Sequence, residues 1–186
     1  MKKKFHTSKT YSNHFKWRKK NLIYVHIGKC GGASLARAIN ESPILKDMYH
    51  QILKVHIKKP EVYKDADYLI VIRNPIQRAI SAFNWRHYLV VEDGAQKNRF
   101  AGEHEVLKKY NTLNNLAEAL YVGNELCTQT AAEFEKVHHL HERISFYLTD
   151  LLAYVDSNQI RFVLAQETLD KDIENMLHVQ NVRKIH

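Results

Sequence analysis

The feature that most constrains the fold of this chain is a short apolar run that leads directly into a cluster of glycines. Residues 21–27 (NLIYVHI) are rich in β-branched and aromatic side chains, which is typical of a buried strand. A tight glycine loop follows from Gly28 to Gly32, and residues 34–40 carry apolar side chains at helical spacing. A strand, a glycine loop and a helix in this order predict an α/β unit whose loop N–H groups and helix N-terminus can hold an anion.

The rest of the chain continues to alternate strands and helices. We expect further strands at 52–57, 68–72 and 161–165, helices at 75–88 and 170–178, and a mostly helical pattern over 103–156. This alternation predicts a three-layer α/β/α fold with a mainly parallel central sheet, in a single domain over residues 21–186. Residues 1–20 precede it as a basic arm with eight lysines and arginines and no acidic residue. We interpret the arm as a solvated, partly disordered tail, with an anion-attracting arm as the alternative.

The composition of the chain indicates which kinds of partner and which cellular location to expect. Its 186 residues carry a formal net charge of +8, which favours anionic partners such as nucleotides, nucleic acid or acidic polysaccharides. No stretch reaches the ~18 uncharged apolar residues of a membrane helix, and the N-terminus lacks the apolar run of a secretory signal. The two cysteines, Cys30 and Cys127, cannot form a disulfide framework, and reduced thiols fit the cytosol. We therefore expect a cytoplasmic protein without a membrane span.

The glycine loop lies in the motif HIGKCGGASL, which suits a phosphate or a sulfate. Lys29 adds a full positive charge to the loop, and Ser34 adds a hydroxyl donor. The motif is not a Walker A loop, because its lysine precedes the glycine pair and no serine or threonine follows the lysine to ligate magnesium. Magnesium-dependent phosphoryl transfer is therefore disfavoured. The alternative is a βα turn whose glycines serve only its geometry.

A second motif, VIRNPIQRAISAF, places Arg73 at the end of the strand 68–72. Strand ends are where open α/β sheets bind ligands, and an arginine can donate two parallel hydrogen bonds to a phosphate. Ser81 follows eight residues later, in a helix begun by Pro75, and we expect it to face the same point because the chain reverses between strand and helix. Arg78 is either a further cation of this site or an ordinary charge on a surface helix.

The two motifs together resemble the sulfotransferase family that uses 3′-phosphoadenosine-5′-phosphosulfate (PAPS) as sulfuryl donor. The resemblance covers residues 22–88 well and the rest of the chain more faintly. It implies a fold like that of P-loop kinases, no metal ion, and adenosine 3′,5′-bisphosphate as the product nucleotide. It also implies that Arg73 and Ser81 bind the 3′-phosphate and that the loop binds the 5′-phosphosulfate through Lys29, Cys30, Gly31, Gly32, Ala33 and Ser34. The letters HIGKCGG are closer to carbohydrate sulfotransferases than to the enzymes of small phenols and steroids.

Sulfuryl transfer needs a stabilised leaving group and a base for the acceptor hydroxyl. Lys29 is the natural stabiliser of the leaving nucleotide. Histidine suits the role of base because it titrates near neutrality. The resemblance places a catalytic histidine between the two motifs, where His50 and His56 lie in YHQILKVHIKK. We assign the base to His56, at the expected end of the second strand, with His50 as the alternative. A surface or core-edge role is the competing interpretation for each.

Other polar residues receive structural interpretations. His138, His139 and His141 lie in VHHLHER, which we expect to be a solvated helix face, because no cysteine or acidic partner completes a clear metal set. Trp85, Arg86 and Tyr88 either line an acceptor cleft or, as we favour, pack in the core. Cys30 is interpreted as a small loop residue rather than a nucleophile, although Lys29 beside it could lower its pKa. Glu167 is expected to be structural.

We therefore predict a PAPS-dependent sulfotransferase whose acceptor is a hydroxyl group on a carbohydrate. The alternatives are a nucleotide-binding phosphotransferase and a non-catalytic binder of polyanions or nucleic acid, with nucleic acid disfavoured. The sequence has no signal that selects one carbohydrate or one oligomeric state. The resemblance further implies a segment after the last helix that covers the adenine. The final residues, VQNVRKIH, are too short to supply it, so we expect a minimal site, completion by a partner, or a truncated chain with impaired activity.

Overall fold

The computed structural model describes residues 19–185, with side chains as far as residue 178. The predicted basic arm therefore lies outside the described residues, except for Lys19 and Lys20. The first half of the chain contains β1 (Asn21–His26), α1 (Gly32–Glu41), α2 (Pro43–Met48), β2 (Ile52–His56), β3 (Ala66–Ile72) and α3 (Pro75–His87). The second half contains the π-helix η1 (Tyr88–Glu92), α4 (Glu103–Tyr110), α5 (Leu113–Ala119), β4 (Tyr121–Val122), β5 (Glu125–Leu126), α6 (Thr128–Phe134), α7 (Ile144–Tyr154), η2 (Ser157–Gln159), β6 (Ile160–Ala165), η3 (Gln166–Thr168) and α8 (Leu169–Ile185).

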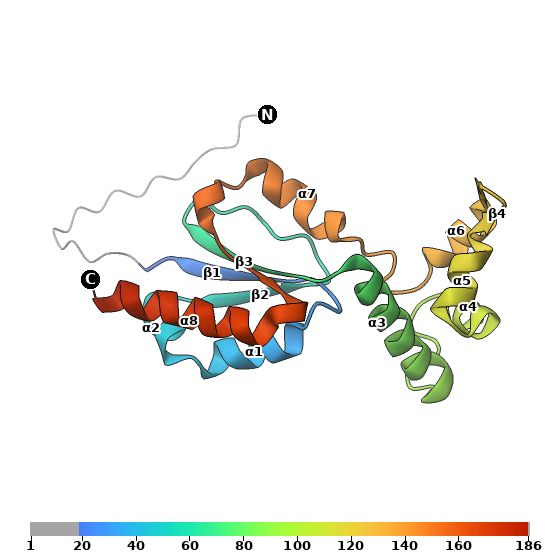
Figure 1. Cartoon of the computed structure of the whole chain (residues 1–186), viewed down its shortest axis with the longest axis horizontal. Helices are drawn as coiled ribbons and strands as arrows, with labels where there is room; N and C mark the ends of the chain where they lie inside the picture. The colour runs from blue at the N-terminus through green and yellow to red at the C-terminus, as the bar shows by residue number, and fades with distance from the viewer. Residues whose placement is uncertain (1–18, 186) are drawn as a thin grey trace.

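The central sheet has four parallel strands in the order β2-β1-β3-β6. Helix α7 covers one face, and α1, α2 and α8 cover the other (Figure 1). The predicted three-layer α/β fold with a parallel sheet is therefore confirmed. The region expected to be mostly helical also contains the short hairpin β4–β5 and a run of turns over residues 135–143.

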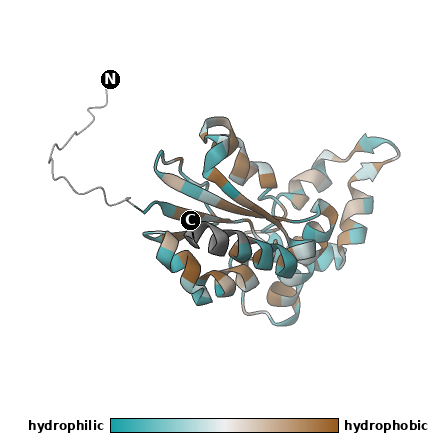
Figure 2. Cartoon of the chain, turned by 60° about the vertical axis from the view of Figure 1, so that its left-hand side comes forward, coloured by the Kyte–Doolittle hydropathy of each residue, from teal (hydrophilic) through white to brown (hydrophobic). Residues whose placement is uncertain are grey.

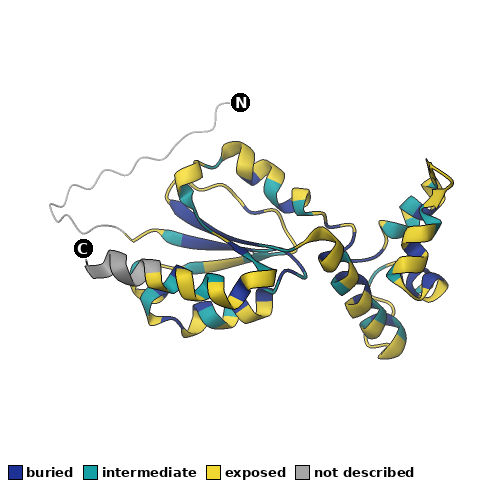
Figure 3. Ribbon diagram, in the orientation of Figure 1, coloured by how far each residue is buried: buried dark blue, intermediate teal, exposed yellow. Residues whose placement is uncertain are grey.

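The two central strands are buried on both faces, as a parallel sheet between helices requires. Four side chains of these strands, Leu22, Val25, Leu69 and Val71, are fully buried. The same core takes in Leu35 of α1 and residues of α7 and α8. The hydrophobic strands lie between the helical layers, whose outward sides are exposed (Figures 2 and 3). Because every strand of this sheet runs in the same direction, all the strands end at one edge.

A second apolar core lies beyond that edge, among α3, η1, α4, α5 and the turns after α6. Its centre includes Phe83, Leu107 and Leu116. A buried ion pair crosses it: Arg86 Nη2 lies 2.6 Å from Glu103 Oε2, and the two side chains are 2% and 1% exposed. Arg86 is thus a core residue, as we favoured, but the same interpretation is wrong for Trp85 and Tyr88, which are 45% and 48% exposed. Among the described residues, no helix combines the length and the apolar character needed to cross a bilayer.

Candidate active site

The loop between β1 and α1 is shaped by tight packing as well as by backbone freedom. Gly31 adopts a left-handed conformation with φ of 78°, and Lys29 does so with φ of 67°. A Cβ atom on Gly32 would lie 1.6 Å from Nε2 of His26, and one on Gly28 would lie 2.5 Å from Nδ1 of His139. Two imidazole rings therefore rest directly on the loop backbone, and only glycine leaves room for them.

The loop forms one wall of a cavity of about 460 Å³. The cavity joins the ends of β1, β2 and β3 to the first turns of α1 and to α3. It brings together eight of the ten residues predicted for the site: Lys29, Gly31, Gly32, Ala33, Ser34, His56, Arg73 and Ser81. His26, Trp85, His139 and Gln166 complete much of the lining. Residues from both sequence motifs thus face one cavity, as parallel strands ending at a common edge allow.

Cys30 and His50 do not line this cavity. The Cys30 side chain is fully buried in the hydrophobic core, and burial raises the pKa of its thiol even though Arg78 and Arg73 act in the opposite direction. Any contact of Cys30 with a ligand would involve its backbone. His50 precedes β2 at the opposite edge of the sheet, where its N–H donates to the Lys20 carbonyl (2.8 Å). It lines a separate cavity with Lys19, Lys20 and Asp65.

Arg73 and Lys29 concentrate positive charge at the loop. The Arg73 Nη1 group donates to the Lys29 carbonyl (3.1 Å), and Arg73 Nε is buried without a hydrogen-bond partner among the described residues. Such an unpaired donor is costly unless a ligand satisfies it. The Lys29 ammonium lies 4.7 Å from the centre of the Trp85 ring. Its pKa is lowered, first by burial and then by the nearby Arg73. An anion in this cavity would favour the charged form of Lys29 and so oppose both effects.

Arg78 is not a surface cation. Its side chain is buried, Nε donates to the Gly28 carbonyl (2.9 Å) and Nη2 donates to the Glu142 carbonyl (2.7 Å). Two successive loop carbonyls, of Gly28 and Lys29, therefore accept hydrogen bonds from arginines of the second motif. These bonds offset carbonyl dipoles that would otherwise repel an anion. Arg78 is thus a support for the loop, a role that helix periodicity alone did not reveal.

His56 and His26 form a stacked pair at the ends of β2 and β1. They occupy directly paired positions of the two strands, and their rings are 4.1 Å apart at an angle of 17°. His56 Nδ1 lies 3.0 Å from the His26 carbonyl oxygen. A carbonyl oxygen only accepts, so Nδ1 carries the hydrogen, and in the neutral tautomer the lone pair lies on Nε2. Burial and the nearby His56, Lys54 and His139 lower the pKa of His26 to about 3, so its ring is neutral.

The expectation of a solvated helix at VHHLHER is wrong. The segment forms turns between α6 and α7, with His139 in a left-handed conformation (φ 69°). His138 and His139 are both buried, and His139 Nδ1 donates to Glu142 Oε2 (3.0 Å). His139 thereby reaches the cavity, and its ring centre lies 6.2 Å from that of His56. Sequence analysis missed the roles of His139 and His26, although a histidine two residues before Gly28 was a signal for the latter.

The last strand is followed by a contact that positions the second motif. Glu167 Oε1 accepts a hydrogen bond from the backbone N–H of Asn74 (2.8 Å), and this contact lowers the pKa of the carboxyl group. Asn74 follows Arg73 directly and caps α3 through its side chain. The structural role expected for Glu167 agrees with this contact.

Comparison with known proteins identifies the family to which this site belongs. The sequence matches the profile of the Sulfotransferase family over residues 13–186. The chain belongs to the Sulfotransferase family. Membership implies a transferase that takes its sulfuryl group from PAPS, and the parallel sheet with its glycine loop is consistent with the P-loop-like fold of sulfotransferases. Searches of curated proteins and of solved structures found no match.

Proposed function

We propose that this sulfotransferase transfers a sulfuryl group from PAPS to a hydroxyl group of a carbohydrate, with His56 as the general base. One observation carries the proposal: a single cavity is lined by the glycine loop, by Arg73, whose Nε has no partner among the described residues, and by His56, whose Nδ1 is held by the His26 carbonyl. The family supports the donor and includes carbohydrate sulfotransferases. The acceptor, the mechanism and the roles of individual residues are our inference.

The cavity fits an anionic nucleotide at two positions. The loop N–H groups, the N-terminus of α1 and the Lys29 ammonium would hold the 5′-phosphosulfate. Arg73 and Ser81, on the other wall, would hold the 3′-phosphate, and the buried Arg73 Nε would gain a partner. When bound, PAPS supplies the sulfuryl group and leaves as adenosine 3′,5′-bisphosphate. Sulfotransferase family membership and the loop lysine that precedes its glycines both disfavour the alternative of a magnesium-dependent phosphotransferase.

In this proposal, different residues of the cavity act as base and as stabiliser of the leaving group. His56 Nε2 accepts the proton of the acceptor hydroxyl as its oxygen forms the new bond to sulfur. Lys29 stabilises the negative charge on the oxygen that leaves when the old sulfur–oxygen bond breaks. The hydrogen bond from Nδ1 to the His26 carbonyl holds the His56 ring in the tautomer that this step requires. Positioning and charge stabilisation thus supply most of the rate.

A sugar acceptor also suits the rim of the cavity. Trp85, which lines it, is 45% exposed, and a pyranose ring can pack against the part of the indole that Lys29 and Tyr88 leave open. Positive net charge favours a glycan that already bears acidic groups. Lys59 contributes little to such binding, because its ammonium is paired with Asp150 (2.8 Å). The cytoplasmic location expected from the two unpaired thiols remains part of this proposal.

Nucleotide binding tests the donor site. We expect adenosine 3′,5′-bisphosphate to bind with micromolar affinity in calorimetry without magnesium, and Arg73→Ala to weaken it by about 100-fold or more, because a buried charge-assisted contact is worth about 2–5 kcal/mol. Arg99→Ala, a substitution in the loop before α4, is the matched control and should leave the affinity unchanged. Equal affinity for adenosine 5′-monophosphate would contradict a 3′-phosphate site.

Turnover tests the base. With labelled PAPS and a panel of glycans, His56→Ala should keep nucleotide affinity and lose about 100-fold or more in kcat. His50→Ala is the control, since that residue lies at the other edge of the sheet, and it should keep full activity. Full activity of His56→Ala would remove His56 from the mechanism, and sulfation of small phenols in preference to every glycan would refute the carbohydrate acceptor.

A further inference from the structure

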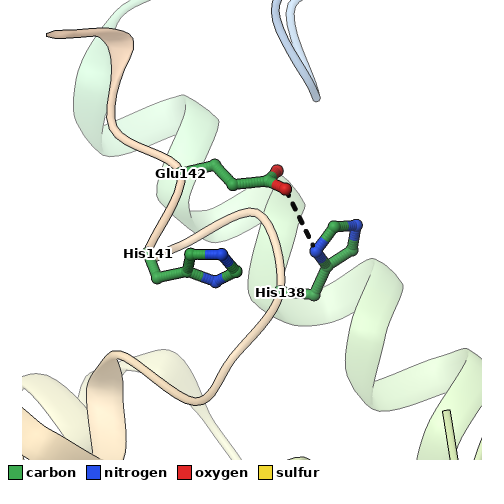
Figure 4. Close-up of side chains that lie close together, drawn as sticks. All are labelled: His138, His141 and Glu142. Atoms are coloured by element: carbon green, nitrogen blue, oxygen red, sulfur yellow. Dashed lines mark ion pairs between the residues drawn. The ribbon is translucent and has the colours of Figure 1, made fainter. Parts of the chain in front are cut away.

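Three side chains between α6 and α7 bring metal-binding atoms together beside the cavity. They are His138, His141 and Glu142, and one ligand atom from each lies within 4.8 Å of the others (Figure 4). Two imidazoles and one carboxylate form a donor set typical of zinc and related transition metals. Sequence analysis set this segment aside because it assumed a helix without an acidic partner; in the turn that forms instead, Glu142 is that partner.

The closest pair already has the spacing of two ligands on one ion. His138 Nδ1 lies 3.3 Å from Glu142 Oε1. Two ligands about 2.1 Å from a zinc ion at the tetrahedral angle are roughly 3.4 Å apart. His141, the third member, has an exposed side chain and can therefore adjust its position at little cost. Its ring centre is 5.9 Å from that of His138.

His138 is a buried imidazole whose Nδ1 atom makes no hydrogen bond to any described residue, although Glu142 Oε1 lies 3.3 Å away. The residue is 6% exposed, and its Nδ1 atom has no hydrogen-bond partner among the described residues. The ring is fixed by stacking on Phe100 at 4.4 Å, and its backbone N–H is held by Glu103 Oε1 (2.8 Å). A fixed ring with a free nitrogen points toward a ligand.

The carboxylate of Glu142 is prepared for the same role. Its Oε2 atom accepts from His139 Nδ1 (3.0 Å) and from the Tyr147 hydroxyl (3.4 Å), which leaves Oε1 facing His138. Hydrogen bonds of this kind orient the carboxylates that bind metals. Two buried guanidinium groups lie nearby: Glu103 pairs with Arg86 through both carboxylate oxygens, and Arg78 donates to the carbonyl oxygens of Gly28 and Glu142. The local charge therefore does not exclude a metal ion.

We propose that His138, His141 and Glu142 form a binding site for a zinc-like divalent transition-metal ion, with water at the fourth position. The ion would hold the turn that presents His139 to the cavity, because Glu142 binds His139 through its other oxygen. It would also fix the Glu142 backbone that Arg78 uses to support the glycine loop. The site is structural, lies outside the reacting atoms, and does not depend on the proposed acceptor or base.

The test uses full-length protein without an affinity tag, freed of metal with a chelator. Cobalt(II) is the probe, because tetrahedral coordination gives an intense visible absorption that zinc then abolishes by displacement. We expect one cobalt ion per chain, tighter than micromolar affinity for zinc, and a rise in melting temperature when zinc is added. Absence of the tetrahedral absorption, or zinc binding no tighter than millimolar, would overturn the proposal.

Three variants assign the ligands. His141→Ala changes an exposed side chain, so it should fold normally, lose about 100-fold or more in zinc affinity and lose the zinc-induced rise in melting temperature. Glu142→Gln should lose a similar factor in zinc affinity, although the side chain keeps nearly the same shape. His104→Ala, a histidine of α4 outside the cluster, is the matched control. Unchanged zinc affinity in His141→Ala, or an equal loss in His104→Ala, would show that the ion binds elsewhere.

Discussion

Replacing Gly32 by alanine tests how tightly the glycine loop is packed. The added Cβ atom would lie 1.6 Å from Nε2 of His26, where a normal contact needs roughly 3.5 Å. The His26 ring would therefore have to move by about 2 Å. It has little room to do so, because it lies between the rings of Tyr24 at 5.6 Å and His56 at 4.1 Å. The substitution thus forces extra volume into a stacked set of three rings.

The magnitude follows from two opposing effects. Overpacking of this kind costs about 1–3 kcal/mol, and the large displacement places Gly32→Ala toward the upper end. Alanine recovers about 0.5–1 kcal/mol relative to glycine in a helix, and less at its first residue. We therefore expect a net loss of about 2 kcal/mol in the free energy of unfolding. Without the His26 contact, the same substitution would be neutral or slightly stabilising.

A double-mutant cycle in urea isolates the contact. The free energy of unfolding is measured for the wild type, Gly32→Ala, His26→Ala and the double variant. We expect Gly32→Ala to cost about 2 kcal/mol in the wild-type background and close to nothing when His26 is alanine. A cost that is the same in both backgrounds, within about 0.5 kcal/mol, would refute the claim that His26 makes this glycine necessary.

Two further predictions concern buried charge and pH. Glu103→Gln should lower the free energy of unfolding by about 3–5 kcal/mol, because Arg86 would lose its buried partner. The control Glu41→Gln, in an exposed pair with Arg37, should cost less than about 1 kcal/mol. Equal losses for the two variants in urea unfolding would contradict this prediction. The pKa of His26 falls from 6.5 to about 3 on folding, so the neutral ring contributes stability that is complete above about pH 6.5 and is lost progressively as the pH falls toward 3. The urea midpoint of the wild type should therefore decrease between about pH 7 and pH 5, and His26→Gln should flatten that decrease; parallel curves would show that His26 does not cause it.

The parts of the site that could be predicted from the sequence are those fixed by local order. A strand followed by glycines and a helix places Lys29 and Ser34 at one edge of a parallel sheet, and a strand followed by a proline-started helix places Arg73 there too. Strand direction alone then brings the two motifs together. His56 follows the same rule, because it is the last residue of its strand.

The parts that could not be predicted depend on contacts between distant segments. Arg78 donates to carbonyls 50 and 64 residues away in the chain, and neither bond has a local signal. The turns at 135–143 likewise form where apolar spacing resembles a helix, because a buried Glu142 satisfies His139 and Tyr147. Such burial depends on the completed fold. Helix periodicity therefore predicted a helix where turns form, and it gave no sign that His139 lines the cavity.

The two motifs that we propose to bind the nucleotide are linked by hydrogen bonds and support each other. Arg73 and Arg78, both from the second motif, hold the carbonyls of Lys29 and Gly28 in the first. The segment expected to bind the 3′-phosphate therefore also fixes the shape of the loop expected to bind the 5′-phosphosulfate. Ser81 makes no such hydrogen bond to the loop among those found for the described residues, so it can contribute to the 3′ site alone. A loss at Arg73 should consequently affect both ends of the nucleotide, whereas a loss at Ser81 should affect only the 3′-phosphate.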